Sequence, residues 1–552
     1  MICPKCGKEN ADDSKFCEHC GAPLEAVVEE VKEEVKAAAE EVKEEVREEA
    51  KEVQTEVKAE VEKKAANIPT PKAPKDPNGK KGLDPKVLIA AIGAVAVIAL
   101  IVILINVFSG GSGSGYKAAY EAIPDPDNEC THIVNAGKVI AKVGEDADVT
   151  TISADGSIAL LTEGDDDDVT VSVIKNGKIT KVAENIEPVA FSDTGASFVF
   201  LNEDEELMLY TVSSGKSEKI AGEIQSTRVA ISPDGKSVLY TQYDEEDEVT
   251  ALYLYASGKS TKIAKDGIYP VTLSNGAKKI YAYDSEGESL VLYNAKGEKV
   301  GKIGGSASKN FVVNQDHTDI IFTDGEKTYI SVDGGEKVKL ASVNMLYPVL
   351  PKSTTMITTR SYGTVYTYGI SNFKNIIVRG GGSLYYLNSK YETENKISDA
   401  SSAMTADGST VYYYKNENLY SKNIKKADAE QVKIASKLAS NFVISSDGKT
   451  VYYINEDDEL HSYKGTKDTK LADDVDYVYI SGKNNVFFES DGGVFYVSGS
   501  SKKAVATEAL GMAVDATGSV YVFKGDEDAY DILYSNGGTK FDDVLKGLSS
   551  EK

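Results

Sequence analysis

Hydrophobic and polar positions divide the chain into segments of different kinds, and the most apolar segment runs from Val87 to Phe108. Its sequence is VLIAAIGAVAVIALIVILINVF, twenty-two residues without a charge. A helix needs about 20 apolar residues to cross a hydrocarbon core ~30 Å thick, because unpaired backbone groups are costly in lipid. A buried core helix would usually carry a polar stripe. We therefore predict one transmembrane helix at 87–108.

The charges on either side of this segment predict its orientation. Lys117 is the only base in the twenty residues that follow the segment. Five lysines precede it: Lys72, Lys75, Lys80, Lys81 and Lys86. Cationic flanks stay in the cytoplasm, so we predict a single-pass protein of the cell membrane with a cytoplasmic N-terminus and an extracytoplasmic C-terminal domain. The chain opens on a polar, cysteine-rich stretch rather than a cleavable signal peptide, so the span would itself direct export.

A charged segment at 25–66 has a helical pattern. Small apolar residues recur with steps of four, four and three, as at Val31, Val35, Ala39 and Val42. This eleven-residue period equals about 3.67 residues per turn and predicts a long α-helical spacer with a straight or slightly right-handed seam. The stripe could mediate self-association as a coiled coil or contact the membrane surface, or it could belong to a solvated helix with Glu–Lys pairs. Residues 67–86 form a Pro/Lys linker.

Beyond a linker at 109–129, residues 130–546 alternate apolar and polar positions as strands do. The clearest unit reads RVAISPDGKSVLYTQ, from Arg228 to Gln242, and similar units recur about every forty residues. Each unit contains four short strand patterns separated by turns. Degenerate copies of the unit occur near Asp316, Lys374 and Lys483. In the other units the turn glycine is one of these residues: Gly156, Gly195, Gly235, Gly276, Gly408, Gly448, Gly518.

This repeat resembles the TolB-type, WD40-like "SPDGK" repeat over roughly residues 130–545. The resemblance implies a β-propeller, in which each repeat supplies one four-stranded blade. We therefore predict a multidomain chain that ends in an all-β propeller of about 8–10 repeat units. The interval between Asp316 and Lys374 is irregular. One large ring, or two smaller propellers joined near 340–375, would fit it.

An acidic residue follows most turn glycines by nine positions. Six such residues are Asp165, Asp204, Asp244, Glu417, Asp457 and Glu527. Equivalent turns of a closed ring lie on one face, so we expect an acidic rim able to attract Ca²⁺ or a basic patch of a partner protein. Solvated hairpin turns that simply favour acidic residues are the alternative.

Four of the five cysteines lie in the first twenty residues. They form two C-x₂-C-G pairs, Cys3 with Cys6 and Cys17 with Cys20. Four thiolates make a closed tetrahedral shell suited to a structural Zn²⁺. We assign residues 1–24 to a zinc ribbon, because residues 2–24 resemble the short zinc ribbon of many bacterial membrane proteins. The resemblance implies a small interaction module, which could contact a cytoplasmic protein partner.

Charge and composition narrow the function. A net charge of −26 with only four arginines argues against nucleic-acid binding. The three histidines after the apolar span, His132, His317 and His461, belong to different repeat units, and no G-x-S-x-G motif occurs. We therefore expect a non-enzymatic binding or scaffold protein of the bacterial cell envelope, whose propeller recognises a protein or envelope ligand. The alternative is a cell-surface hydrolase that acts on glycan or peptide through propeller carboxylates.

Overall fold

The computed structural model describes residues 115–549, except 165–168, 223, 225–227, 245–248, 306–308, 352–353, 394, 401, 427–428, 500 and 527–528. Within this part no helix is long and apolar enough to cross a membrane. The predicted zinc ribbon at 1–24, helical spacer at 25–66, linker at 67–86 and transmembrane helix at 87–108 lie outside the described residues, so these remain predictions.

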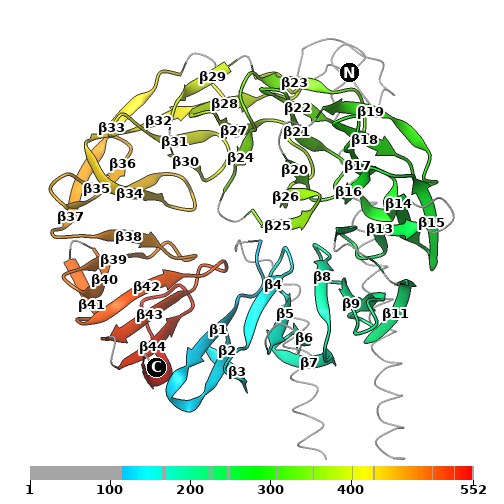
Figure 1. Cartoon of the computed structure of the whole chain (residues 1–552). Helices are drawn as coiled ribbons and strands as arrows, with labels where there is room; N and C mark the ends of the chain where they lie inside the picture. The colour runs from blue at the N-terminus through cyan, green and yellow to red at the C-terminus, as the bar shows by residue number, and fades with distance from the viewer. Residues whose placement is uncertain are drawn as a thin grey trace, which may run out of the picture. The chain divides into compact units, whose positions relative to one another are not determined.

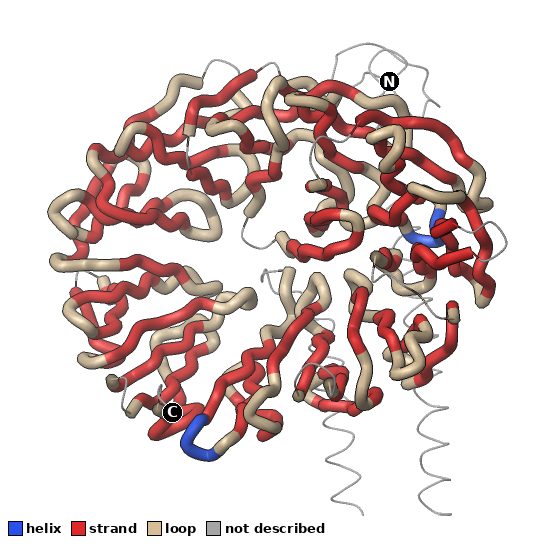
Figure 2. The backbone as a smooth tube through the Cα atoms, in the orientation of Figure 1, coloured by secondary structure: helices blue, strands red, loops and turns tan. Residues whose placement is uncertain are grey.

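Strands make up nearly all of the regular secondary structure of the described chain, with two short 3₁₀ helices, η1 (Pro126–Asn128) and η2 (Asn275–Ala277) (Figure 2). The strands form eleven sheets, nine with four strands, one with three and one with six. Each sheet is a blade, and the blades stand around a central axis (Figure 1). The described part of the chain is an eleven-bladed β-propeller.

The first four blades contain these strands in chain order: blade 1, β1 (Tyr120–Asp125), β2 (Cys130–Asn135), β3 (Lys138–Val143); blade 2, β4 (Asp148–Ile152), β5 (Ile158–Glu163), β6 (Thr170–Lys175), β7 (Lys178–Ala183); blade 3, β8 (Glu187–Phe191), β9 (Ser197–Leu201), β10 (Leu207–Thr211), β11 (Lys216–Ala221); blade 4, β12 (Val229–Ile231), β13 (Ser237–Asp244), β14 (Val249–Ala256), β15 (Lys259–Ala264).

The next three blades include the irregular region: blade 5, β16 (Ile268–Leu273), β17 (Ile280–Asp284), β18 (Ser289–Tyr293), β19 (Lys299–Gly305); blade 6, β20 (Asn310–Asn314), β21 (Ile320–Asp324), β22 (Lys327–Ser331), β23 (Val338–Ala341), with the added pair β25 (Met356–Ser361) and β26 (Gly363–Tyr368); blade 7, β24 (Tyr347–Val349), β27 (Ile376–Gly380), β28 (Ser383–Leu387), β29 (Asn395–Asp399).

The last four blades are regular: blade 8, β30 (Ser402–Thr405), β31 (Thr410–Lys415), β32 (Asn418–Asn423), β33 (Val432–Ser436); blade 9, β34 (Leu438–Ile444), β35 (Thr450–Asn455), β36 (Leu460–Lys464), β37 (Lys467–Ala472); blade 10, β38 (Tyr477–Ile480), β39 (Val486–Ser490), β40 (Gly493–Ser498), β41 (Ser501–Ala506); blade 11, β42 (Ala509–Val514), β43 (Val520–Gly525), β44 (Tyr530–Ser535), β45 (Asp542–Leu548).

The SPDGK repeat specifies the turn between the first and second strands of a blade. In blade 4 the Ser232 hydroxyl donates to the Asp234 carboxylate at 2.7 Å and accepts the Ser237 amide at 3.0 Å. Gly235 closes the turn with φ 72°, a left-handed conformation that glycine adopts without a Cβ clash. Polar groups of the motif thus satisfy the turn, and the flanking runs form the antiparallel pair β12–β13.

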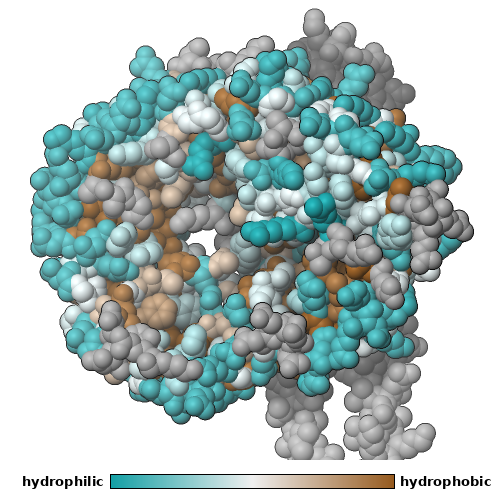
Figure 3. Space-filling view, viewed as in Figure 1, coloured by the Kyte–Doolittle hydropathy of each residue, from teal (hydrophilic) through white to brown (hydrophobic). Residues whose placement is uncertain are grey.

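Hydrophobic clusters join each blade to its neighbours. The cluster between blades 4 and 5 combines Leu239 and Leu252 with Leu273 and Ile280, all fully buried. The ring closes in the same way, because Val134 of blade 1 packs with Tyr521, Ile532 and Leu548 of blade 11 (Figure 1). Hydrophobic side chains gather toward the interior, and hydrophilic ones occupy the outer edge (Figure 3).

The predicted count of about 8–10 repeat units was too low, and of the two arrangements left open the single large ring is confirmed. The ten anchors mark the first turn of blades 2 to 11, whereas blade 1 has no such turn. Tyr120 of β1 packs with Ala159 and Leu161 of β5, the second strand of blade 2. Strand β1 therefore corresponds to a second strand, and among the described residues blade 1 lacks the innermost one. The propeller therefore extends beyond the predicted bounds 130–546, because β1 begins at Tyr120, inside the predicted linker 109–129, and β45 ends after residue 546.

The irregular interval between Asp316 and Lys374 contains an insertion rather than a joint between two propellers. After β24 the chain leaves blade 7, forms the β25–β26 hairpin inside the ring, and returns to blade 7 as β27 (Figure 1). Strand β26 pairs in parallel with β20, the innermost strand of blade 6. All other strand pairs in the described chain are antiparallel.

Candidate functional site

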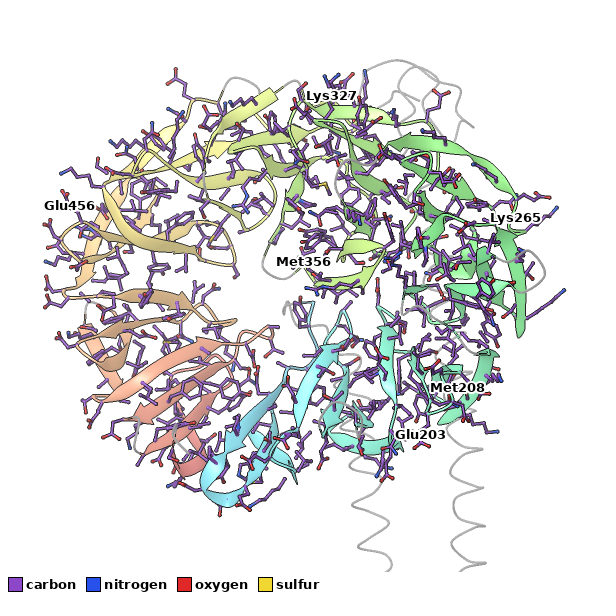
Figure 4. All side chains as sticks on the ribbon, in the orientation of Figure 1. Glu203, Met208, Lys265, Lys327, Met356 and Glu456 are labelled. Carbon is purple, nitrogen blue, oxygen red and sulfur yellow. The ribbon has the colours of Figure 1, made fainter. Side chains whose placement is uncertain are left out.

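The inserted β25–β26 hairpin creates the most distinctive site of the ring. At its tip the Ser361 hydroxyl donates to the carbonyl of Val271 at 2.6 Å, and the Tyr362 amide donates to the carbonyl of Pro270 at 3.0 Å. Both acceptors belong to β16 of blade 5. Hydrogen bonds therefore fix the hairpin at its tip, to β16, and along its β26 edge, to β20, with Met356 facing the interior of the ring (Figure 4).

A cavity of about 300 Å³ lies between the hairpin and the inner strands of blades 2 to 5. Hydroxyl groups from both sides line it, and β8 and β12 add apolar side chains such as Phe191 and Ile231. The lining hydroxyls come from six threonines and one serine: Thr150, Thr151, Thr162, Thr272, Thr358, Thr359, Ser361. Rigid strands surround this space, so the cavity is a preformed recess with both hydroxyl and apolar lining groups.

His317 stands at the turn-glycine position of blade 6. Its amide donates to the carbonyl of Asn314 at 3.0 Å, as the Gly235 amide donates to that of Ser232 at 2.8 Å in blade 4. The φ angle of His317 is 53°, a conformation that costs a residue with a Cβ about 1–2 kcal/mol. A large side chain in this conformation indicates that its contacts compensate the strain.

Those contacts join four parts of the ring at the cavity wall. His317 Nε2 lies 2.8 Å from Asp193 Oδ2 of blade 3 and 3.0 Å from Thr367 Oγ1 of β26. Its Nδ1 lies 2.6 Å from Thr272 Oγ1 of blade 5. With its proton on Nε2, the imidazole donates to Asp193 and accepts the Thr272 hydroxyl proton. All four side chains are buried, so the network holds the hairpin in place.

Positive charge collects near the hairpin tip. Tyr269, Tyr362 and Tyr283 form a stack, with ring centroids 5.0 Å apart for the first two and 4.6 Å apart for the last two. Arg228 lies 4.6 Å above Tyr269, and Lys309 lies 4.7 Å above Tyr362. The two cations therefore lie over the tyrosine stack at the hairpin tip.

Arg360 on β25 contributes the cavity's guanidinium. Its side chain is exposed, and within the described part of the ring no carboxylate forms an ion pair with it. A guanidinium presents planar donors that suit carboxylate, sulfate or phosphate groups. The site therefore combines an anion-binding side chain with hydroxyl groups.

The predicted acidic rim is described only in part. Asp165 and Glu527 lie outside the described residues, and for Asp244 only the backbone, the end of β13, is described. Asp204, Glu417 and Asp457 are exposed, and each follows the second strand of its blade. Figure 4 shows their neighbours Glu203 and Glu456 at the outer perimeter.

Lysines offset part of this outer negative charge. Lys219 pairs with Glu206, Lys470 pairs with Glu459, and Lys437 pairs with Glu456 at 2.9 Å. Exposed pairs of this kind are worth little energy but reduce the local field. Asp204, Glu417 and Asp457 thus lie at equivalent turns of three different blades and do not meet in one site.

The sequence reasoning missed His317 and Arg360 as a site. The spacing of the turn glycines could have indicated His317, because the chain has His317 instead of glycine forty-one residues after Gly276. Arg360 gave no such signal, since the insertion that places it in the ring matches no repeat. The four predicted zinc ligands, Cys3, Cys6, Cys17 and Cys20, lie outside the described residues.

Comparison with known proteins supports the N-terminal module. Residues 2–24 match the family of zinc-ribbon domains, which agrees with the resemblance seen in the two cysteine pairs. No curated protein matches the chain.

Solved structures that resemble the chain are distant. TolB from Acinetobacter baumannii is 15% identical, with 43% of this chain and 68% of TolB covered and a TM-score of 0.25. PorZ, a surface component of the type-IX secretion system of Porphyromonas gingivalis, is 11% identical, with 78% and 66% covered and a TM-score of 0.28. An oligogalacturonate lyase in complex with manganese is 10% identical, with 68% and 93% covered and a TM-score of 0.24. The fold assignment rests on the eleven sheets themselves.

Proposed function

We propose that this chain is a membrane-anchored, non-enzymatic binding protein whose extracytoplasmic propeller holds an envelope or protein ligand at the cavity beside the β25–β26 hairpin. The observation that carries the proposal is Arg360, a guanidinium without an ion-pair partner in the described ring, beside a hydroxyl-lined recess of about 300 Å³. A ligand with a carboxylate, sulfate or phosphate group and neighbouring hydroxyls matches these donors. Acidic glycans and acidic peptide segments carry such groups.

Binding is favoured over catalysis because of how the cavity's titratable side chains are used. Asp193 bonds to His317, and His317 also bonds to Thr272 and to Thr367 of the hairpin, so the two titratable side chains hold the hairpin in place. A glycosidase would instead need two carboxylates about 5–10 Å apart on either side of the ligand. Asp193 is the single carboxylate among the residues that line this cavity.

The remaining parts of the chain fit the same role. A transmembrane helix at 87–108 would anchor the propeller outside the cytoplasm, and the spacer at 25–66 would extend into it, with self-association through its Val/Ala stripe. A zinc ribbon with Zn²⁺ on Cys3, Cys6, Cys17 and Cys20 would offer a contact for a cytoplasmic protein. The acidic turns at Asp204, Glu417 and Asp457 would supply a second, Ca²⁺-dependent or basic-partner contact.

In-cell cross-linking of the full-length protein, followed by mass spectrometry, tests the ligand site. Wild type should capture an acidic glycan or peptide near Arg360, and Arg360→Gln should lose at least about tenfold of that capture, because a charge-assisted hydrogen bond is worth about 1.5–3 kcal/mol. Arg379→Gln, the same change on β27 outside the cavity, should capture normally. Equal capture by both variants, with cross-links at the acidic turns, would move the site to the rim.

A further inference from the structure

Three different metal-ligand side chains meet at the β1–β2 hairpin of blade 1. Asp125 ends β1 and is the register partner of Cys130, which begins β2. His132 lies two residues further along β2, so it projects from the same face as Cys130. Asp125, Cys130 and His132 therefore lie on one face of the sheet.

The donor atoms of these side chains converge on a common point. Asp125 Oδ2 lies 3.0 Å and Cys130 Sγ lies 3.9 Å from His132 Nε2, and the three atoms all lie within 4.8 Å of one another. Zinc bonds of about 2.0–2.3 Å to N, O and S place tetrahedral ligand atoms roughly 3.3–3.7 Å apart. Shifts of less than about 1 Å would therefore seat an ion among them.

A catalytic Cys–His–Asp relay does not fit this arrangement. A relay needs the thiol on one imidazole nitrogen and the carboxylate on the other. Here both contacts fall on Nε2, while the buried Nδ1 has no hydrogen-bond partner in the described structure. Cys130 is also only 3% exposed, which suits a ligand better than a nucleophile that must reach a substrate.

We propose that Asp125, Cys130 and His132 bind a divalent transition-metal ion, with Zn²⁺ preferred. One thiolate, one imidazole and one carboxylate match the softness of zinc, and three protein ligands leave one tetrahedral position for water. Asn128 supports the set, because its side-chain amide donates to both oxygens of Asp125 at 3.0 Å and orients the carboxylate.

The position of the site suggests what the metal does. Ile123 of β1, on the same face, packs at the cluster that joins blade 1 to blade 11, together with Tyr530 of β44. Among the described residues, no covalent link joins blades 1 and 11 at this seam, and blade 1 lacks its innermost strand. A metal that clamps the β1–β2 hairpin would stiffen the edge at which the ring closes.

Cobalt spectroscopy on the full-length chain in detergent tests this site. Cys3, Cys6, Cys17 and Cys20 are replaced by serine, so that Cys130 is the remaining thiol. Added Co²⁺ should then give a thiolate charge-transfer band that saturates at one ion per chain. Zn²⁺ should abolish the band and raise the melting temperature.

Variants decide the assignment. Cys130→Ser should remove the band and the zinc-dependent rise in melting temperature. Asp125→Asn, which keeps the thiol, should weaken Co²⁺ binding at least about tenfold. His461→Gln is the matched control, because His461 contacts the carboxylates of Glu459 and Asp468 and should keep the band. A folded chain without the band, or a zinc-dependent rise that survives Cys130→Ser, would overturn the proposal.

Discussion

A single residue, His317, shows how a repeat can be altered to build a site. Seven blades have glycine at the left-handed turn position, and blade 6 has a histidine there with φ 53°. The ring of His317 reaches Asp193, 124 positions away in the chain, and Thr367, 50 positions away. The repeat period of the sequence can show that a histidine replaces the turn glycine. The hydrogen-bond partners of that histidine are known only once the ring is closed.

Replacing His317 should loosen the inserted hairpin. His317→Ala leaves Asp193 buried without its imidazole donor, and an unsatisfied buried polar group costs about 1–3 kcal/mol. Relief of side-chain strain in the left-handed turn would not offset this, since alanine keeps its Cβ. We expect a lower melting temperature and faster hydrogen exchange at residues 356–368. His461→Ala, at a more exposed position, should leave exchange in the hairpin unchanged.

Asp155 should give the ring a measurable pH dependence. Burial disfavours its charge, but hydrogen bonds from Lys117, Ser157 and Ser153 outweigh burial and lower the pKa of Asp155 to about 2. The folded pKa lies below the unfolded value near 3.8, so the carboxylate stabilises the fold above pH 4 and loses this effect as the pH falls toward 2.

The variant Asp155→Asn isolates this contribution. Because the group is partly exposed, solvent screening limits the expected loss at pH 7 to about 1 kcal/mol. The difference in unfolding free energy between wild type and variant should shrink between pH 4 and pH 2. Urea titrations at several pH values measure it, with the exposed Asp146→Asn as the charge-matched control. A difference that stays constant down to pH 2 would contradict the role given to Asp155.

At the scale of elements, the S-x-D-G turn explains why the blades could be predicted from the sequence. In blade 9 the Ser445 hydroxyl donates to Asp447 at 2.6 Å and accepts the amide of Thr450, as in blade 4. These contacts are local, so the motif alone specifies the first hairpin. The β25–β26 hairpin has no such motif, and its position depends on pairing with β20, whose partner strands are distant in sequence.

Turn glycines should differ in how strongly they resist alanine. Gly156 and Gly276 both have left-handed backbones, with φ 74° and 65°, so either substitution should cost about 1–2 kcal/mol. A Cβ at Gly156 would also lie 2.0 Å from the carbonyl oxygen of Ala118, whereas nothing lies within 4 Å at Gly276. Thermal melts should show the larger loss for Gly156→Ala. Equal losses of stability would mean that the backbone at Ala118 can move away from the added methyl group without cost.

At the scale of the whole molecule, ring closure was the part hardest to predict. Ten repeat anchors suggested ten units at most, because the eleventh unit, blade 1, lacks the strand and turn that carry the anchor. Its β1 sequence, YEAIPD, shows little alternation and includes a proline. The match between blades 1 and 11 depends on Val134 meeting Leu548, a contact that no local pattern encodes.

The closing seam should be the first interface of the ring to open. At every other interface the chain passes directly from one blade to the next, which keeps neighbours at high effective concentration, as in repeat proteins. Among the described residues no strand pairs across the seam between blades 1 and 11, which meet through side-chain packing with Leu548 2% exposed within it. Leu548→Ala should cost about 2–5 kcal/mol at this interface and raise hydrogen exchange mainly in β1–β3 and β42–β45. Leu273→Ala removes an equally buried leucine between blades 4 and 5, where β15 leads directly into β16, so it should lower overall stability without exposing that interface selectively. If both variants exchange alike, covalent connection contributes little, and the ring opens as one cooperative unit.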